Sequence, residues 1–183
     1  MTNRSKSIKA ITEGGIFTAA YALLAIISRY LLTGTDSLIY YFTPLVIAIY
    51  VIRNKISFSI AVFFASIALS FLFANPIVTL MVILPNIIIG FVFGCLEKYS
   101  KIKLMNYIIT FALCFITNII SIIAFEVIQG VDYWEDVVVI INNFAEYFPV
   151  LNSGLVESII KIAIIATLLI DSVIKTVLLY LVI

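Results

Sequence analysis

Residues 77–96, IVTLMVILPNIIIGFVFGCL, contain no charged side chain over a length that can cross the hydrocarbon core of a bilayer as one helix. Five further apolar runs are separated by charged residues or by glycine, asparagine and proline. The sequence therefore predicts an all-α integral membrane protein, a six-transmembrane-helix bundle that forms a single domain, residues 1–183. The predicted helices span residues 12–32, 38–52 (a short one), 56–73, 77–96, 104–125 and 155–175, and an outer loop spans residues 126–152.

Composition supports a membrane location, since 64% of the residues are hydrophobic, 11% are charged, and the mean hydropathy is +1.24. No soluble domain can bury so much apolar surface. The net charge of +1 leaves no basic face for nucleic acid. The absence of histidine removes the commonest metal ligands and general bases, so neither a cofactor nor catalysis is expected. Cys95 and Cys114 lie in separate apolar runs, which indicates a packing role.

The placement of positive charge predicts the orientation of the helices. Loops on one side of the predicted bundle contain the basic residues, and the opposite loops contain acids but no lysine or arginine. Because basic loops remain in the cytoplasm, both termini are expected to be cytoplasmic, in a multi-pass protein of the cell membrane. The residues on the predicted cytoplasmic side are Arg4, Lys6, Lys9, Arg53, Lys55, Lys98, Lys101 and Lys103.

Proline and small residues predict local helix geometry. Pro85 should kink the fourth helix and free a carbonyl group, which either borders a cavity or is a tolerated packing kink. Small residues four apart let membrane helices approach closely. Such pairs are Gly15 with Ala19, Ala61 with Ala65, and Gly90 with Gly94. For Gly90 with Gly94, in the fourth helix, packing within the chain and contact with a partner both remain open.

Polar residues inside the apolar runs are candidates for function, because charge is costly in a bilayer. In one interpretation, Glu157 with Lys161 and Asp171 with Lys175 neutralise each other at a spacing of four residues. In the other, a polar pocket opens to the outside in the outer half of the bundle. The residues predicted to line that pocket are Arg29, Asn118, Glu157 and Lys161.

The outer loop mixes acidic, aliphatic and aromatic residues. It is either an amphipathic segment on the membrane surface, with Trp134 at the interface, or a lid over the outward pocket. In the lid interpretation, Trp134 joins the predicted substrate-binding residues, and the aromatic rings could stack on a flat heterocyclic ligand.

These features together resemble a known family. The length, six helices with both ends inside, the small-residue stretch Gly15 to Ala22 and the aromatic outer loop look like an S component, the substrate-capturing subunit of energy-coupling factor (ECF) vitamin transporters. Over residues 8–103, the chain also resembles YybS-like membrane proteins. The similarity to YybS-like proteins rests on Thr12-Glu13-Gly14-Gly15, Thr43-Pro44, Asn75-Pro76, and Gly90 with Gly94 before a basic loop. The stretch from Asp171 to Lys175 is similar instead to a polar-then-lysine pattern near the last helix of S components.

The resemblance implies a bacterial membrane subunit that binds a vitamin or similar micronutrient from outside. Its partners would be a transmembrane coupling subunit and two ATPase subunits. Gly15, Ala19 and Ala22 would form the surface that docks on the coupling subunit. The chain itself would not be an enzyme, and it has no phosphate-binding motif of the GxxxxGK[ST] kind.

Two other classes of protein remain as alternatives. A structural membrane protein of the cell-shape or cell-wall machinery, resembling the MreD family, would have a similar length and need no ligand pocket. An intramembrane enzyme could use Glu13, Glu157 or Asp171 as a carboxylate, but these acids have no histidine partner.

Overall fold

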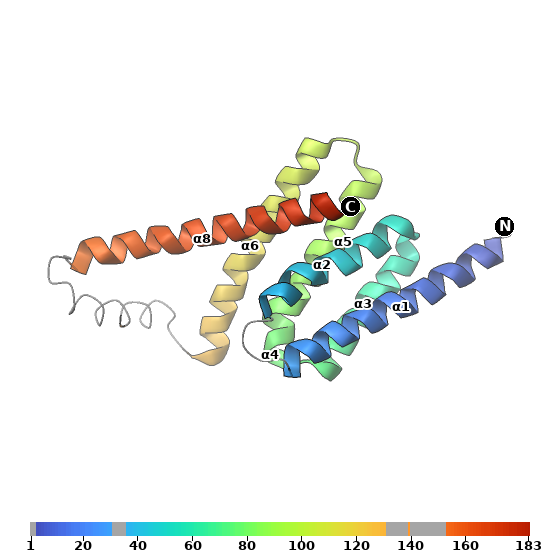
Figure 1. Ribbon diagram of the computed structural model, residues 1–183, viewed down its shortest axis with the longest axis horizontal. Coiled ribbons are helices and arrows are strands. Elements are labelled where there is room, and N and C mark those ends of the chain that lie inside the picture. The colour runs from blue at the N-terminus through green and yellow to red at the C-terminus, as the bar shows by residue number, and fades with distance from the viewer. Residues whose placement is uncertain (1–2, 31–35, 131–138, 140–152) are drawn as a thin grey trace.

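The computed structural model describes residues 3–30, 36–130, 139 and 153–183, and every regular element in this part of the chain is a helix (Figure 1). The all-helical class and the six helices are thereby confirmed, while the orientation of the termini stays a prediction. Five helices are long and apolar enough to cross a membrane, and the second has a shorter apolar part, Tyr40–Arg53.

The helices are α1 (Asn3–Tyr30), α2 (Asp36–Arg53), α3 (Ile56–Phe73), a composite fourth helix, α6 (Lys103–Gln129) and α8 (Ser153–Val182). The composite helix joins α4 (Pro76–Val78), the π-helical turn η1 (Thr79–Ile83) and α5 (Leu84–Tyr99).

Two helices are longer than the apolar pattern predicts. The first begins at Asn3 rather than at residue 12, because the lysines that precede the apolar run are themselves good helix formers. The last continues to Val182 rather than ending at residue 175, since no glycine or proline interrupts the chain there. A charged residue therefore does not mark where either helix ends.

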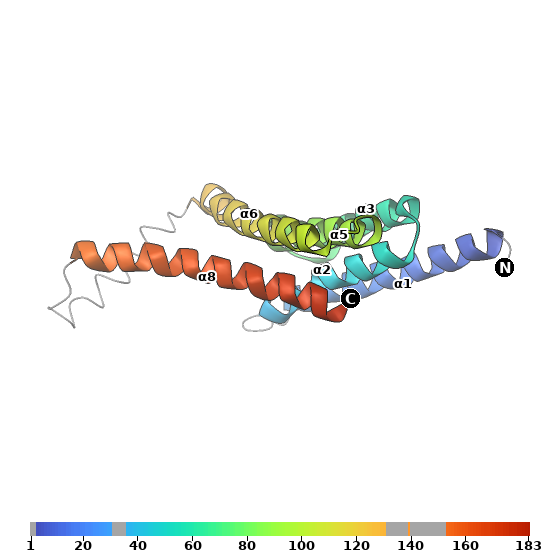
Figure 2. The same cartoon turned by 90° about the horizontal axis from the view of Figure 1, so that it is seen from above.

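The helices form two layers, with α3, α5 and α6 in one and α1, α2 and α8 in the other (Figure 2). The most extensive contacts join α2 to α5, α1 to α3, and α6 to α8. The first half of α8 extends away from the other helices, and its second half crosses α6 (Figure 1). The short helix α2 therefore lies near the centre of the bundle, and its residues Ile47, Ala48 and Val51 are almost fully buried.

The contact between α2 and α5 depends on glycine. A Cβ atom at Gly90 would collide with the backbone carbonyl of Pro44, and one at Gly94 would lie 2.7 Å from the Cβ of Val51. A side chain at either position would therefore force α2 and α5 to move apart. The internal-packing interpretation of this glycine pair is thereby confirmed.

The predicted irregularity at Pro85 takes the form of the π-helical turn η1, which immediately precedes α5. Proline has no N–H to donate to the carbonyl group four residues earlier, here that of Met81. The Ser121 hydroxyl of α6 donates to the Met81 carbonyl at 2.8 Å, and the Asn86 amide donates to the Val82 carbonyl at 2.8 Å. Side chains thus satisfy the carbonyl groups that the irregular turn frees, as an apolar surrounding requires.

Candidate functional site

A cluster of polar side chains lies where α2, α5, α6 and α8 meet. We call these seven residues the polar cluster, and all of them lie in the apolar part of their helices. A set of polar groups at this depth is costly unless its members bind one another, so it is a candidate site. The polar cluster consists of Tyr40 and Tyr41 of α2, Asn86 of α5, Asn118 of α6, and Asp171, Ser172 and Lys175 of α8.

Asp171 is the acceptor at the centre of the polar cluster. Its carboxylate accepts hydrogen bonds from the Tyr41 hydroxyl at 2.5 Å, from the Asn118 amide at 2.9 Å and from the Tyr40 hydroxyl at 3.2 Å. Two helices other than its own thus supply the donors. Asp171 and both tyrosines are partly exposed, so this end of the polar cluster lies at the surface of the described helices.

Asn118 and Tyr40 connect α2, α6 and α8. The Tyr40 hydroxyl lies 2.5 Å from the Asn118 side-chain oxygen, and the Asn118 amide also donates to the Ser172 hydroxyl at 3.2 Å. Because a tyrosine hydroxyl carries one proton, Tyr40 can donate fully to only one of the two acceptors, Asn118 or Asp171, at a time. Tyr40 therefore links the two acceptors in a network that a small rotation of its O–H bond rearranges.

Lys175 forms the buried end of the polar cluster, with 1% of its surface exposed. Its ammonium group donates to the Asn86 side-chain oxygen at 3.1 Å and lies 3.2 Å from the centre of the Tyr40 ring, an arrangement that stabilises a cation. The bond from Asn86 to the Val82 carbonyl fixes the amide so that its oxygen faces Lys175. Instead of neutralising each other directly, Asp171 and Lys175 thus bind neutral groups on other helices.

The predicted substrate-binding residues fall in different places. Asn118 belongs to the polar cluster, with 7% of its surface exposed. Lys161 is exposed in the first half of α8. Arg29 lies on α1 and Glu157 on α8, but their side chains are outside the part of the chain that is described, and so is Trp134.

Of the seven members of the polar cluster, sequence reasoning assigned only Asn118 to the predicted substrate site. It paired Asp171 with Lys175 and missed the other four. Tyr40 and Tyr41 are aromatic residues near a helix end, a position that usually indicates the membrane interface. Asn86 follows a proline, which suggests only a local backbone bond. The signal that could have found the site is the sequence Asp171-Ser172 followed by Lys175, since it places three polar groups on one side of an otherwise apolar helix.

The predicted docking residues lie beside a groove between α1 and α3. The groove has a volume of about 470 Å³ and an almost entirely apolar lining. Gly15 and Ala19 are exposed in it, while Ala22 is partly buried and does not belong to its lining. Small residues on both walls leave the backbones of α1 and α3 accessible. Those residues are Gly14, Gly15 and Ala19 of α1, and Ala61 and Ala65 of α3.

Contacts at the other end of α2 have a structural role. The Lys98 ammonium group of α5 donates to the backbone carbonyl of Val51 in the last turn of α2, at 3.0 Å, and to that of Asn54, directly after the end of α2. The Asn54 amide donates to the Glu13 carboxylate of α1 at 3.1 Å. A lysine at a helix C-terminus satisfies carbonyl groups that have no partner in the helix, so Lys98 caps α2 and ties it to α5.

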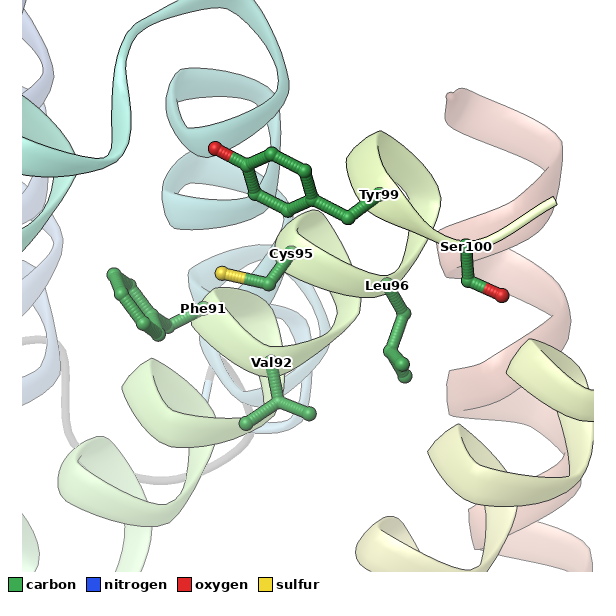
Figure 3. Close-up of a pocket in the computed structure, with 6 residues that line it drawn as sticks. All are labelled: Phe91, Val92, Cys95, Leu96, Tyr99 and Ser100. Atoms are coloured by element: carbon green, nitrogen blue, oxygen red, sulfur yellow. The ribbon is translucent and has the colours of Figure 1, made fainter.

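A second hollow, of about 420 Å³, lies along the last turns of α5 (Figure 3). Its lining comes from α5 and from Ser100, and Figure 3 shows the Phe91 ring, the Cys95 thiol and the Tyr99 ring on one side of the helix. None of the lining residues is charged. The hollow therefore lacks the convergent polar groups that fix a small ligand.

Comparison with known proteins places the chain in a family. No curated protein and no solved structure matches it. A family described as a predicted membrane protein, DUF2232, matches residues 19–149, more than two thirds of the chain. The match includes four members of the polar cluster, Tyr40, Tyr41, Asn86 and Asn118, and ends before Asp171. The chain therefore belongs to the DUF2232 family of predicted membrane proteins.

Proposed function

We propose that this protein is the substrate-binding subunit of an ECF-type importer and captures a vitamin or a similar micronutrient from outside the cell. The observation that carries the proposal is the polar cluster. It holds a carboxylate and an ammonium group within apolar helices, and such groups persist in membrane proteins chiefly where they bind a solute or an ion.

The position of the polar cluster supports capture from outside. In the predicted orientation, α2 begins on the outer side and ends at the basic residues Arg53 and Lys55. Tyr40 and Tyr41 lie in the first turns of α2 and are partly exposed. A solute that enters from outside would therefore meet the tyrosines and Asp171 before it meets the buried Lys175.

The groove between α1 and α3 supports a partner role for that side of the bundle. Its small residues would let a helix of a transmembrane coupling subunit approach the backbones closely, which favours association within a bilayer. Two ATPase subunits on the cytoplasmic side would supply the energy, and this chain would bind its substrate without chemical change. A structural protein of the MreD type would need no buried charges, which is why we prefer the transport role.

Native mass spectrometry of the detergent-purified protein tests substrate capture. We expect a vitamin-sized molecule that co-purifies with the wild type and is released on denaturation. The variant Asn118→Leu should lose it, because Asn118 links α6 to Asp171. The control Thr167→Ala should keep it, since Thr167 is exposed and bonds only the Ala163 carbonyl of its own helix. A wild type without a bound molecule, which co-purifies instead with cell-shape proteins, would favour the MreD-type role.

Co-purification from membranes tests the docking surface. We expect Ala19→Leu to reduce recovery of the coupling and ATPase subunits, because a leucine would fill the groove. Ala112→Leu is the matched control, since Ala112 is exposed on α6 and does not line the groove. Equal recovery with both variants would count against docking at α1.

A further inference from the structure

We infer that the substrate is an organic cation, whose positive group is held by the Asp171 carboxylate beside the rings of Tyr40 and Tyr41. This inference rests on the proposed function, and it names the substrate class of the same site. It follows from three observations: which charged group of the polar cluster is exposed, which hydrogen bonds each charged group makes, and which aromatic rings lie beside them.

Accessibility favours the carboxylate as the first contact. Asp171 and Tyr41 are partly exposed, whereas Lys175 has 1% of its surface exposed and Asn86 has none. Lys175 is covered by the Tyr40 ring, which lies 3.2 Å from its ammonium nitrogen. The group of the polar cluster that a solute can reach is therefore negative.

Within the described part of the chain, the bonds of Asp171 leave room for one more donor. A carboxylate offers about four acceptor positions. The Tyr41 hydroxyl, the Tyr40 hydroxyl and the Asn118 amide use at most three of them, and none of these donors carries a charge. The carboxylate is thus oriented by neutral groups, and a cationic donor would add the charge-assisted bond that it lacks.

An anionic substrate fits this site poorly. To bind Lys175, an anion would have to displace the Asn86 side-chain oxygen, at 3.1 Å, and the Tyr40 ring. It would also have to pass the Asp171 carboxylate, which repels it in a medium where charges are weakly screened. Lys175 acts instead as the internal counter-charge that keeps an empty site neutral.

The aromatic rings add a second reason to expect a cation. The Tyr40 and Tyr41 rings meet edge to face, with centres 5.3 Å apart and planes at 78°. One face of Tyr40 already binds the ammonium group of Lys175. Tyrosine faces attract organic cations through the negative charge above the ring, and adjacent rings beside a carboxylate strengthen that attraction. The partly exposed Tyr41 ring would supply this surface to the substrate.

A set of four probes tests the inference on the wild-type protein in detergent, with a potassium phosphate buffer. The probes are benzylammonium, benzoate, benzyl alcohol and sodium chloride, and the readout is the unfolding temperature together with displacement of the co-purified molecule. We expect benzylammonium to stabilise the protein and displace that molecule, and the other three to do neither. Stabilisation by benzoate, benzyl alcohol or sodium alone would overturn the organic-cation assignment.

The variant Asp171→Asn sharpens the result, because asparagine keeps the size of the side chain and removes its charge. We expect the affinity for benzylammonium to fall by about tenfold to a hundredfold, the usual worth of a hydrogen bond to a charged group. Equal affinity would overturn the role of Asp171. If this variant does not fold, the comparison of the four probes on the wild type still decides the inference.

The charge of the co-purified molecule separates the two proposals. A positively charged molecule supports both the transport role and the cation assignment. A bound carboxylic acid or neutral molecule would leave substrate capture standing and overturn the cation assignment. A protein that neither co-purifies with a molecule nor responds to any probe would contradict both.

Discussion

Two stripes of small residues in this protein follow the same sequence pattern and have opposite surroundings. Gly90 and Gly94 of α5 face α2 so closely that a Cβ atom at Gly90 would collide with the Pro44 carbonyl. Gly15 and Ala19 of α1 line an open groove, and a Cβ atom at Gly15 would meet nothing within 4 Å. A small-xxx-small pattern thus marks a place where helices can approach, and it does not tell whether the approaching helix belongs to the same chain.

The difference extends to neighbouring residues on α1. A Cβ atom at Gly14 would lie 2.9 Å from the Tyr50 hydroxyl oxygen and 2.9 Å from a methyl group of Val62. Gly14 is therefore part of the packing among α1, α2 and α3, whereas Gly15 is free of it. One step along the helix separates a structural glycine from one that is available to a partner, because successive residues point about 100° apart around the axis.

The largest effect is expected for Gly90→Ala. The added methyl group would collide with the backbone of α2, which cannot rotate away, so α2 and α5 would have to separate. We expect the free energy of unfolding to fall by about 3 kcal/mol or more, at the upper end of overpacking effects. Unfolding by SDS in mixed micelles measures this value, and a change below about 1 kcal/mol would contradict the close contact.

Gly94→Ala should have a smaller effect at the same interface. Its methyl group would lie 2.7 Å from the Val51 Cβ and 3.0 Å from the Ala48 carbonyl oxygen, distances that a slight shift of α2 can relieve. We expect a loss of about 1–2 kcal/mol in the same titration. A loss larger than that of Gly90→Ala would mean that the tightest approach of the two helices lies nearer the C-terminal end of α5.

Lys98→Met tests the polar link between α5 and α2. Methionine keeps the apolar stem and removes the ammonium group that caps the carbonyls of Val51 and Asn54. Because Lys98 is partly exposed and water can replace its bonds, we expect a loss of only about 1 kcal/mol. Lys101→Met is the control, since Lys101 is exposed after the end of α5. The free energy of unfolding of this variant should equal that of the wild type. Equal effects of the two variants would refute the cap.

The smallest effect is expected for Gly15→Ala. No atom lies within 4 Å of the added methyl group, and alanine favours a helix over glycine by about 1 kcal/mol. The free energy of unfolding should therefore stay the same or rise slightly in the SDS titration. A clear loss of stability would show that the α1 stripe is packed within the chain, like that of α5, and would remove the contrast between the two.

Much of the fold was predictable from local chemistry. Runs of apolar residues determine where helices form in a membrane, since each backbone polar group must find its partner within the helix. The break at Asn75 and Pro76 was recognisable for the same reason, and α4 begins at Pro76, with the Asn75 side chain accepting from the Ile77 N–H. The irregular turn before Pro85 was also predictable, because proline always removes one helical hydrogen bond.

The candidate site was predictable only in part. Asn118, Asp171 and Lys175 stood out as polar residues in apolar runs, but Tyr40 and Asn86 did not. A tyrosine near a helix end usually indicates the membrane interface, and an asparagine after a proline usually indicates a local bond to the backbone. Only the crossing of α8 over α6 brings Asp171 and Lys175 to α2 and α5, and no local pattern encodes that crossing.

The sequence by itself determined that this protein is a bundle of six helices in a membrane, because hydropathy, helix breakers and charge act over a few residues at a time. Tertiary structure alone decided that Asp171 and Lys175 bind different helices, that the α5 stripe packs on α2, and that the α1 stripe stays open. The physical reason is the distance along the chain. Tyr41 and Asp171 are joined by a hydrogen bond across 130 positions of sequence, and only the packing of whole helices can bring them within 2.5 Å.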